Sequence, residues 1–171
     1  MKHIFSIPIL ETEIELSKIK VSDAEFKPTW ESDILTTFES GLKVYDSTWR
    51  YLHRIIDPFL TSLGDPYTGI FFSNMWRNKY DPRSYQGYHI HPKVQWSYII
   101  YETVPSRTSF INPCITLIQN QWTDHSKVCP MDYRPDLKPG SMIVFPSFVA
   151  HQVLSGNDGT TLSGNISVEY T

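Results

Sequence analysis

Three histidines dominate the chemistry that this sequence could support. His89 and His91 are separated by one residue in the stretch GYHIHPKVQWSYIIY (87–101), and His151 follows about sixty residues later in FPSFVAHQV (145–153). Alternate side chains of an extended strand point to the same face, so His89 and His91 present both imidazoles on one side of a sheet. Such a pair, with a third histidine at a strand end, is typical of a facial metal site that keeps open coordination positions.

The chemistry of such a site depends on its charge. Imidazole ligands suit Fe, Zn, Cu and Ni, so the ligand type does not select the metal. Three neutral histidines leave the dipositive charge of the ion uncompensated, and we therefore expect anionic guests such as carboxylates, thiolates or hydroxide. One interpretation is an iron oxygenase that binds a 2-oxo acid, and another is a three-histidine dioxygenase whose substrate itself chelates the metal. Ser97 has no base or orienting acid at a recognisable spacing, which argues against a hydrolase.

Composition restricts the class of protein. A chain of 171 residues fits a single domain (1–171), and 14% aromatic residues with twelve prolines favour many short strands over a helical bundle. The net charge of −3 and the lack of a basic run give no indication of a surface that binds nucleic acid. Cys114 and Cys129 lack the spacing of a zinc site or disulfide framework, so we expect reduced thiols. The opening segment does not resemble a signal peptide and no run approaches a membrane span, which favours a cytoplasmic protein without a membrane partner.

The order of secondary structure predicts a mainly β fold. Residues 4–16 alternate as an edge strand, and two helices are expected: one over 30–38, and a second from a cap at Asp46 or Ser47 to Gly64, which Pro58 should bend or restart. From about residue 67, short β-rich runs follow one another, and the run 96–101 is expected to return beside the strand of His89. The economical architecture is a double-stranded β-helix, or jelly roll, over about 67–171, with the strand and helices of about 1–66 packed on it. The β-rich runs are 68–72, 96–100, 115–119, 141–145 and 166–170.

At several of these segments the chain resembles a known family. IFSIPI, the Trp76 region, WSYIIY, VPSRTSFINP, KPGSMIVFPSFVAHQV and ISVEY are similar to the 2-oxoglutarate/Fe(II) oxygenases of bacteria and tailed phages, and the pattern PG-x-x-x-x-FPS-x-x-x-H is the most specific piece. The resemblance implies an oxidoreductase with Fe(II) and 2-oxoglutarate as cofactors, located in the host cytoplasm if a phage encodes it. It makes His89 the first metal ligand and His151 the distal one, and places His91 where relatives carry the carboxylate of an HxD motif. It also implies that Ser97 and Tyr101 lie on the strand that lines the cosubstrate pocket.

One departure from the family pattern concerns the cosubstrate. The closing strand of the family usually reads Arg-x-Ser, whose arginine pairs with the far carboxylate of 2-oxoglutarate, and the corresponding text here is Asn165-Ile166-Ser167. Asparagine cannot form that ion pair. The 2-oxoglutarate carboxylate would then need another cation, for which Arg107 is the better candidate and Lys127 the second. One alternative is that 2-oxoglutarate is not the cosubstrate. Another is that the chain is a non-catalytic binding or structural domain. For partners we expect a small-molecule or peptide substrate, with a homodimer as the candidate assembly.

Overall fold

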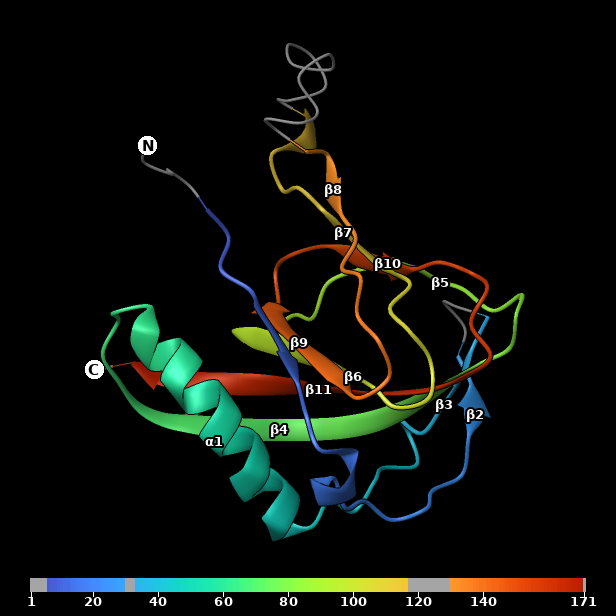
Figure 1. Cartoon of the computed structure of the whole chain (residues 1–171), viewed down its shortest axis with the longest axis horizontal. Coiled ribbons are helices and arrows are strands. Elements are labelled where there is room, and N and C mark those ends of the chain that lie inside the picture. Colours follow the sequence, from blue (N-terminus) through green and yellow to red (C-terminus); the bar gives the residue numbers. More distant parts are fainter. Residues whose placement is uncertain (1–5, 30–32, 117–129, 171) are drawn as a thin grey trace.

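Two antiparallel sheets form the body of the protein (Figure 1). The computed structural model describes residues 6–29, 33–116 and 130–170. The larger sheet has the strand order β1-β9-β6-β11-β4-β3-β2, and the smaller sheet has the order β5-β10-β7-β8. This is the jelly-roll arrangement that the sequence predicts. The strands are β1 (Leu10–Glu13), β2 (Lys27–Pro28), β3 (Leu35–Thr36), β4 (Tyr67–Tyr80), β5 (Gln86–His89), β6 (Trp96–Tyr101), β7 (Thr108–Ile111), β8 (Asp132–Tyr133), β9 (Ser141–Pro146), β10 (His151–Val153) and β11 (Gly159–Tyr170).

The helix α1 (Asp46–Ser62) covers the outer face of the larger sheet. Leu52, Ile56 and Leu60 recur at four-residue steps, so they lie on one side of the helix and are buried. They pack against strand residues that point outward from the barrel, and Figure 1 shows α1 lying across β4 and β11. This packing fixes the orientation of the long strands. The outward-pointing core residues are Met75, Trp96, Tyr98, Ile100, Met142, Val144, Leu162, Ile166 and Val168.

The opposite face of the same strands supplies the interior of the barrel. Because side chains alternate along a strand, Ile99 and Tyr101 of β6 point inward, where they pack with Ile143 and Phe145 of β9 and Phe110 of β7. This inner cluster fills the space between the two sheets and ends beside His151, whose ring contacts Phe145 edge-on with centroids 4.8 Å apart. The packed end of the barrel therefore supports the histidine cluster.

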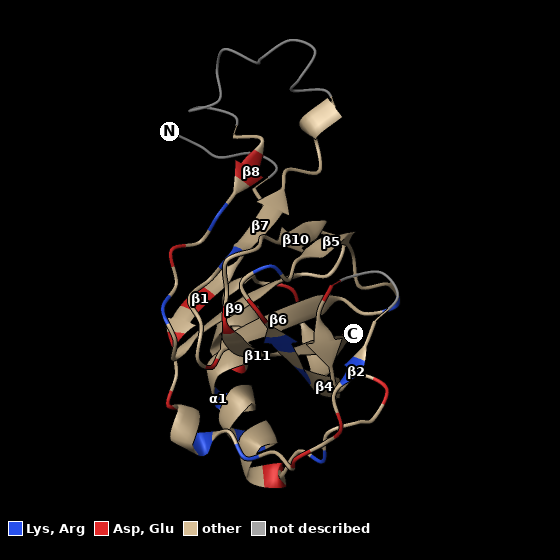
Figure 2. Ribbon diagram, turned by 90° about the vertical axis from the view of Figure 1, so that its right-hand side faces the viewer, with Lys and Arg blue, Asp and Glu red and all other residues tan. Residues whose placement is uncertain are grey.

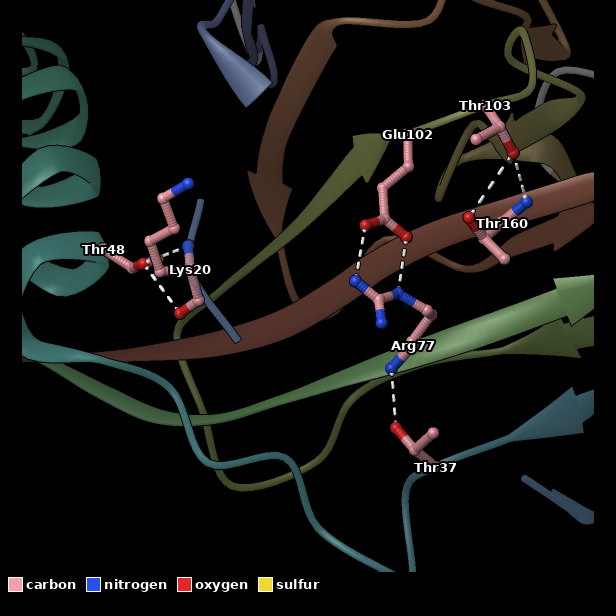
Figure 3. Close-up of polar contacts among 7 residues, drawn as sticks. All are labelled: Lys20, Thr37, Thr48, Arg77, Glu102, Thr103 and Thr160. Atoms are coloured by element: carbon pink, nitrogen blue, oxygen red, sulfur yellow. Dashed lines mark hydrogen bonds and ion pairs between the residues drawn. The ribbon is translucent and has the colours of Figure 1, made fainter. Parts of the chain in front are cut away.

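An ion pair joins β4 to the residue that follows β6, and these two strands flank β11 (Figure 3). Arg77 on β4 donates from Nε and Nη2 to the two carboxylate oxygens of Glu102, each at 2.8 Å, and both side chains are largely buried. The hydrogen bond to Glu102 raises the pKa of Arg77, with burial acting in the opposite direction. The backbone N–H of Arg77 also donates to Thr37 Oγ1, which ties the segment after β3 to the sheet.

The structure differs from three expectations about secondary structure. Residues 33–38 form no helix but carry the short strand β3, and residues 30–32 lie outside the described part of the chain. Leu35 and Phe38 remain 41% and 56% exposed, so the apolar pattern there did not mark a face buried against a sheet. The second helix does not restart at Pro58, and its N-cap is Tyr45, without a side-chain cap bond. Of the run 115–119, residues 115 and 116 are helical and the others lie outside the described residues.

The strand after the HxH pair also differs from expectation. β6 does not return beside β5: it pairs with β9 and β11 in the larger sheet, whereas β5 pairs with β10 in the smaller one. Pro92 and the positive φ of Lys93 (68°) lie in the connection that carries the chain from one sheet to the other. Among the described residues, no helix is long and apolar enough to span a membrane.

Candidate metal centre

His89, His91 and His151 meet at one end of the barrel. His89 and His151 are directly opposite each other in the β5–β10 pair, and their ring centroids are 4.2 Å apart. His91 follows the end of β5, with its ring 5.3 Å from each of the other two. One potential ligand atom from each histidine lies within 4.8 Å of the others. The cross-strand pairing, together with the two-residue step from His89 to His91, thus gathers three imidazoles around one point.

Hydrogen bonds select the tautomer of each ring. Nδ1 of His89 lies 2.8 Å from the carbonyl oxygen of Gly87, and Nδ1 of His151 lies 3.1 Å from that of Val149. Nδ1 of His91 lies 2.7 Å from Oδ1 of Asn165. A carbonyl oxygen only accepts, so each Nδ1 must carry the proton and the neutral ring keeps its lone pair on Nε2. This is how outer groups orient metal-binding histidines in proteins.

Burial favours the neutral form that a metal requires. Burial is the largest cause that lowers the pKa of His91 to about 4; the hydrogen bond to Asn165 raises that pKa and the charge of His89 lowers it further. Burial also lowers the pKa of His151 well below its ordinary value, and the charges of His89 and His91 act in the same direction. At neutral pH both rings are therefore unprotonated and able to bind a cation.

The environment of His91 provides a test of whether a metal fits. Nε2 of His91 is buried and has no hydrogen-bond partner among the described residues. A buried polar atom without a partner is costly, and its lone pair faces the other two rings. Trp76 stacks on the His91 ring with centroids 5.7 Å apart, so the imidazole has little freedom to turn elsewhere. Three nitrogen donors, one of which has no hydrogen-bond partner, fit an iron ion, and they leave other coordination positions open.

Asn165 belongs to a polar network that holds His91. Its Oδ1 accepts the His91 Nδ1 proton and, at 3.0 Å, the hydroxyl of Ser97. Ser97 is fully buried and lies 2.8 Å from the hydroxyl of Ser147, whose backbone oxygen accepts the N–H of His91. The sequence placed Asn165 and Ser97 with the cosubstrate; in the structure Asn165 bonds the ring of His91, and Ser97 bonds Asn165. Ser147 was missed, although it is the serine of the FPS motif.

A cavity inside the barrel adjoins the three histidines. Its enclosed interior measures about 20 Å³, room for roughly one water molecule, and the whole concavity with its open mouth measures about 410 Å³. Arg107, just before β7, is the cation on its wall within the described part of the chain. The guanidinium lies against Gly156, where an added Cβ would stand 2.9 Å from Cζ of Arg107. The other polar residues on the wall are Asn78, Tyr80, Gln86, Tyr101, Thr108, Asn157, Thr161 and Ser163.

The inward-facing residues of β11 are divided between the cavity and His91. Thr161 and Ser163 line the cavity, whereas Asn165 lies farther along the same face, at His91. Ser167 lines neither this cavity nor the groove outside the histidines. Lys127 lies outside the described residues. Tyr101 does line the cavity, and burial raises its pKa to about 12, so it is a neutral phenol that can donate a hydrogen bond.

The chain is thus a jelly-roll protein with a three-histidine cluster that could hold a metal ion. The family model described as "Putative 2OG-Fe(II) oxygenase" matches residues 74–163, just over half of the chain. The chain belongs to this family, and it is an oxidoreductase whose cofactors are Fe(II) and 2-oxoglutarate. No curated protein matches the sequence.

Solved structures share the fold at low sequence identity. An oxidoreductase of the 2OG-Fe(II) oxygenase family from Burkholderia pseudomallei is 15% identical over 91% of this chain and 71% of its own, with a TM-score of 0.51. HygX from Streptomyces hygroscopicus, solved with nickel, 2-oxoglutarate and hygromycin B, is 8% identical over 94% and 82%, with a TM-score of 0.52. The non-heme alpha ketoglutarate dependent epimerase SnoN is 11% identical over 85% and 65%, with a TM-score of 0.53.

Proposed function

We propose that His89, His91 and His151 hold the Fe(II) ion of this oxygenase and that Arg107 binds the far carboxylate of 2-oxoglutarate. The observation that carries the proposal is that one cavity is lined by all three histidines and by Arg107. Bound iron supplies the redox chemistry, in which O₂ oxidises 2-oxoglutarate to succinate and carbon dioxide while a substrate C–H bond is oxidised. The protein supplies binding, orientation and electrostatics.

The properties of Arg107 support a role in binding an anion. Its side chain is exposed, and among the described residues no carboxylate pairs with it, so its charge is available to a ligand. A guanidinium can hold a carboxylate through two parallel hydrogen bonds. The neutral hydroxyls of Tyr101, Thr108 and Ser163 lie on the same wall and can donate to the second oxygen or to the 2-oxo acid chain.

The size of the cavity implies that its wall moves when the cosubstrate binds. An interior of about 20 Å³ is too small for a five-carbon dicarboxylate. Most of the wall is fixed in strands, whereas Arg107 precedes β7 and has an exposed, flexible side chain. We propose that Arg107 moves off Gly156 to admit the cosubstrate and closes on its carboxylate.

The test is an anaerobic titration of the Fe(II)-loaded protein with 2-oxoglutarate, followed by the visible charge-transfer band of a chelated 2-oxo acid. Arg107→Gln should weaken the binding of 2-oxoglutarate by about 10- to 100-fold, which corresponds to the loss of a charged hydrogen bond of roughly 1.5 to 3 kcal/mol. Arg134→Gln, at an arginine outside the cavity lining, is the matched control. Adding Thr161→Arg to Arg107→Gln moves the cation to β11, on the other sheet that lines the cavity, and should restore part of the affinity.

Two results would contradict the proposal. Unchanged affinity in Arg107→Gln would remove Arg107 from the cosubstrate site. Iron bound at the three histidines without any charge-transfer band would favour a three-histidine dioxygenase that does not use 2-oxoglutarate, or a non-catalytic domain.

A further inference from the structure

A second, larger depression lies on the outer side of the histidines. It is an open groove of about 760 Å³ that runs between the β2–β3 segment, β4 and the β5 end, and His89 and His91 line it together with Trp76. This volume is within the range of sites that hold drug-sized ligands, so several linked residues of a chain would fit. The barrel cavity and the groove therefore share His89 and His91, and the groove is the one with room for a substrate.

The groove combines apolar side chains with little charge. Phe38, Tyr88 and Ile90 line it and are 56%, 54% and 51% exposed, although large apolar side chains are usually covered. Lys27 and Glu39 are the charged residues of its lining and have opposite signs, and Figure 2 shows no Lys, Arg, Asp or Glu on β5. A ligand of this groove is thus expected to carry apolar groups and little net charge.

Two asparagines place hydrogen-bonding groups beside the metal centre. Asn74 and Asn165 are direct cross-strand partners on β4 and β11, and both line the groove. Oδ1 of Asn74 is buried and has no partner among the described residues, so an acceptor there lacks a donor. Oδ1 of Asn165 is already occupied by His91 and Ser97, which leaves its amide N–H groups for the groove. One unpaired acceptor and one available donor, on residues whose Cβ atoms lie about 5 Å apart across the strand pair, match the N–H and C=O that one residue of an extended peptide directs to the same side.

We propose that this groove binds a peptide segment as the substrate of the oxygenase, with the backbone N–H and C=O of one residue held by Asn74 and Asn165 and with uncharged apolar side chains on Phe38, Tyr88 and Ile90. This assignment of substrate class rests on the proposed function, because it takes the three histidines as the iron site. A lipid chain would leave Oδ1 of Asn74 and the amide N–H groups of Asn165 unpaired, which costs free energy in a covered site. A glycan would stack on the aromatic rings but gains little from Ile90.

The probe is a library of uncharged, N-acetylated and C-amidated octapeptides, offered anaerobically to the protein loaded with Fe(II) and 2-oxoglutarate. Binding is measured by fluorescence anisotropy, and the change of the 2-oxoglutarate charge-transfer band is recorded in the same sample. Phe38→Ser and Tyr88→Ser should each lower the affinity for an enriched peptide at least about tenfold. Phe71→Ser, at a phenylalanine of β4 that is 52% exposed outside the groove, is the control and should bind as the parent does.

The amide contact is tested by removing its two sides separately. N-methylation of the peptide, one position at a time, should identify a position where affinity falls about tenfold, and Asn74→Leu should produce a similar loss without changing bound iron. In Asn74→Leu the same N-methylation should then have no further effect, because the contact is already absent.

The proposal is overturned if no peptide is enriched, if the groove variants bind like Phe71→Ser, or if fatty amides or oligosaccharides bind in the peptide's place. Anisotropy does not require iron. Peptide binding without any charge-transfer band would therefore contradict the proposed cosubstrate and support the groove assignment. A normal band without peptide binding would support the proposed cosubstrate and contradict the groove assignment.

Discussion

His91 donates its Nδ1 proton to Oδ1 of Asn165 over 2.7 Å, and this bond orients the ring toward the other two histidines. Ser97 donates to the same oxygen, so the carboxamide is held from two sides in a buried network. An aspartate at this position would also accept both bonds, but it would add a negative charge. Asn165 therefore keeps the centre neutral before metal binds and leaves the positive charge of the ion for anionic ligands.

Replacing Asn165 by leucine should weaken metal binding about 10- to 100-fold, as expected for the loss of an outer partner of a ligand histidine. Asn165→Asp restores the acceptor and should bind metal at least as well as the parent. The measurement is a chelator competition with Co(II), whose visible spectrum also reports coordination geometry. Ser73→Ala is the control, because Ser73 bonds only the backbone oxygen of Asn165. Parent-like affinity in Asn165→Leu would show that this bond does not position His91.

The metal-free protein should lose stability as the pH falls below about 6.5. Burial lowers the pKa of His91 to about 4 and that of His151 well below 6.5. Between these values the unfolded chain binds protons that the folded chain does not, so the free energy of unfolding should decrease by about 1.4 kcal/mol per pH unit for each histidine.

Urea unfolding of the metal-free protein from pH 7.5 to 4.5 measures this slope. His151→Gln should reduce the slope by the contribution of one histidine, about 1.4 kcal/mol per pH unit. His53→Gln, on the exposed side of α1, should leave the slope unchanged. A flat profile for the parent chain would mean that the buried rings accept protons without cost.

The ion pair between Arg77 and Glu102 should stabilise the sheet that carries the centre. Arg77→Gln is expected to cost about 1.5 to 3 kcal/mol, because a buried carboxylate loses a bidentate donor. Arg134→Gln breaks a pair whose side chains are 63% and 38% exposed, and should cost less than about 1 kcal/mol. Equal effects of the two changes on urea unfolding would argue against the importance of burial at Arg77.

Much of the fold and the identity of the clustered histidines could be predicted from the sequence. The β-rich runs separated by turn residues indicated a jelly roll, and the four-residue steps of Leu52, Ile56 and Leu60 indicated the helix that covers it. His89 and His91 share a face because of their spacing, and the FPS-x-x-x-H pattern identified His151 as their partner. The local sequence pattern is sufficient to predict a helix or strand where one face of that element is buried along its whole length.

Long-range register could not be predicted in the same way. Thr161, Ser163 and Asn165 all point to one face of β11, so the period of two gave no reason to prefer one of them for the cavity. The pairing of β6 with β9 and β11 also depends on a crossing between sheets, which no residue in 87–101 specifies by itself. Arg107 reaches the cavity from a segment before β7, and only the three-dimensional arrangement brings it there.

His91→Asp should keep iron, because the shorter carboxylate starts from the same backbone position and partly compensates the charge of the ion. Metal content after anaerobic reconstitution, compared with that of the parent, measures this. Loss of iron in His91→Asp alone, with the other two histidines intact, would indicate that the third imidazole has a geometric role that a carboxylate cannot fill. The hydrogen bond to Asn165 is the contact that this substitution would remove.

The most direct measurement of the central claim is bound iron per chain in His151→Ala after anaerobic reconstitution, recorded beside the far-UV CD melt. His151 is 2% exposed and contributes one of the three gathered ligand atoms, so its removal should reduce iron from about one per chain to nearly none. The CD spectrum should remain that of a folded β protein, which separates loss of the site from loss of the fold. Full iron occupancy in folded His151→Ala would contradict the three-histidine centre.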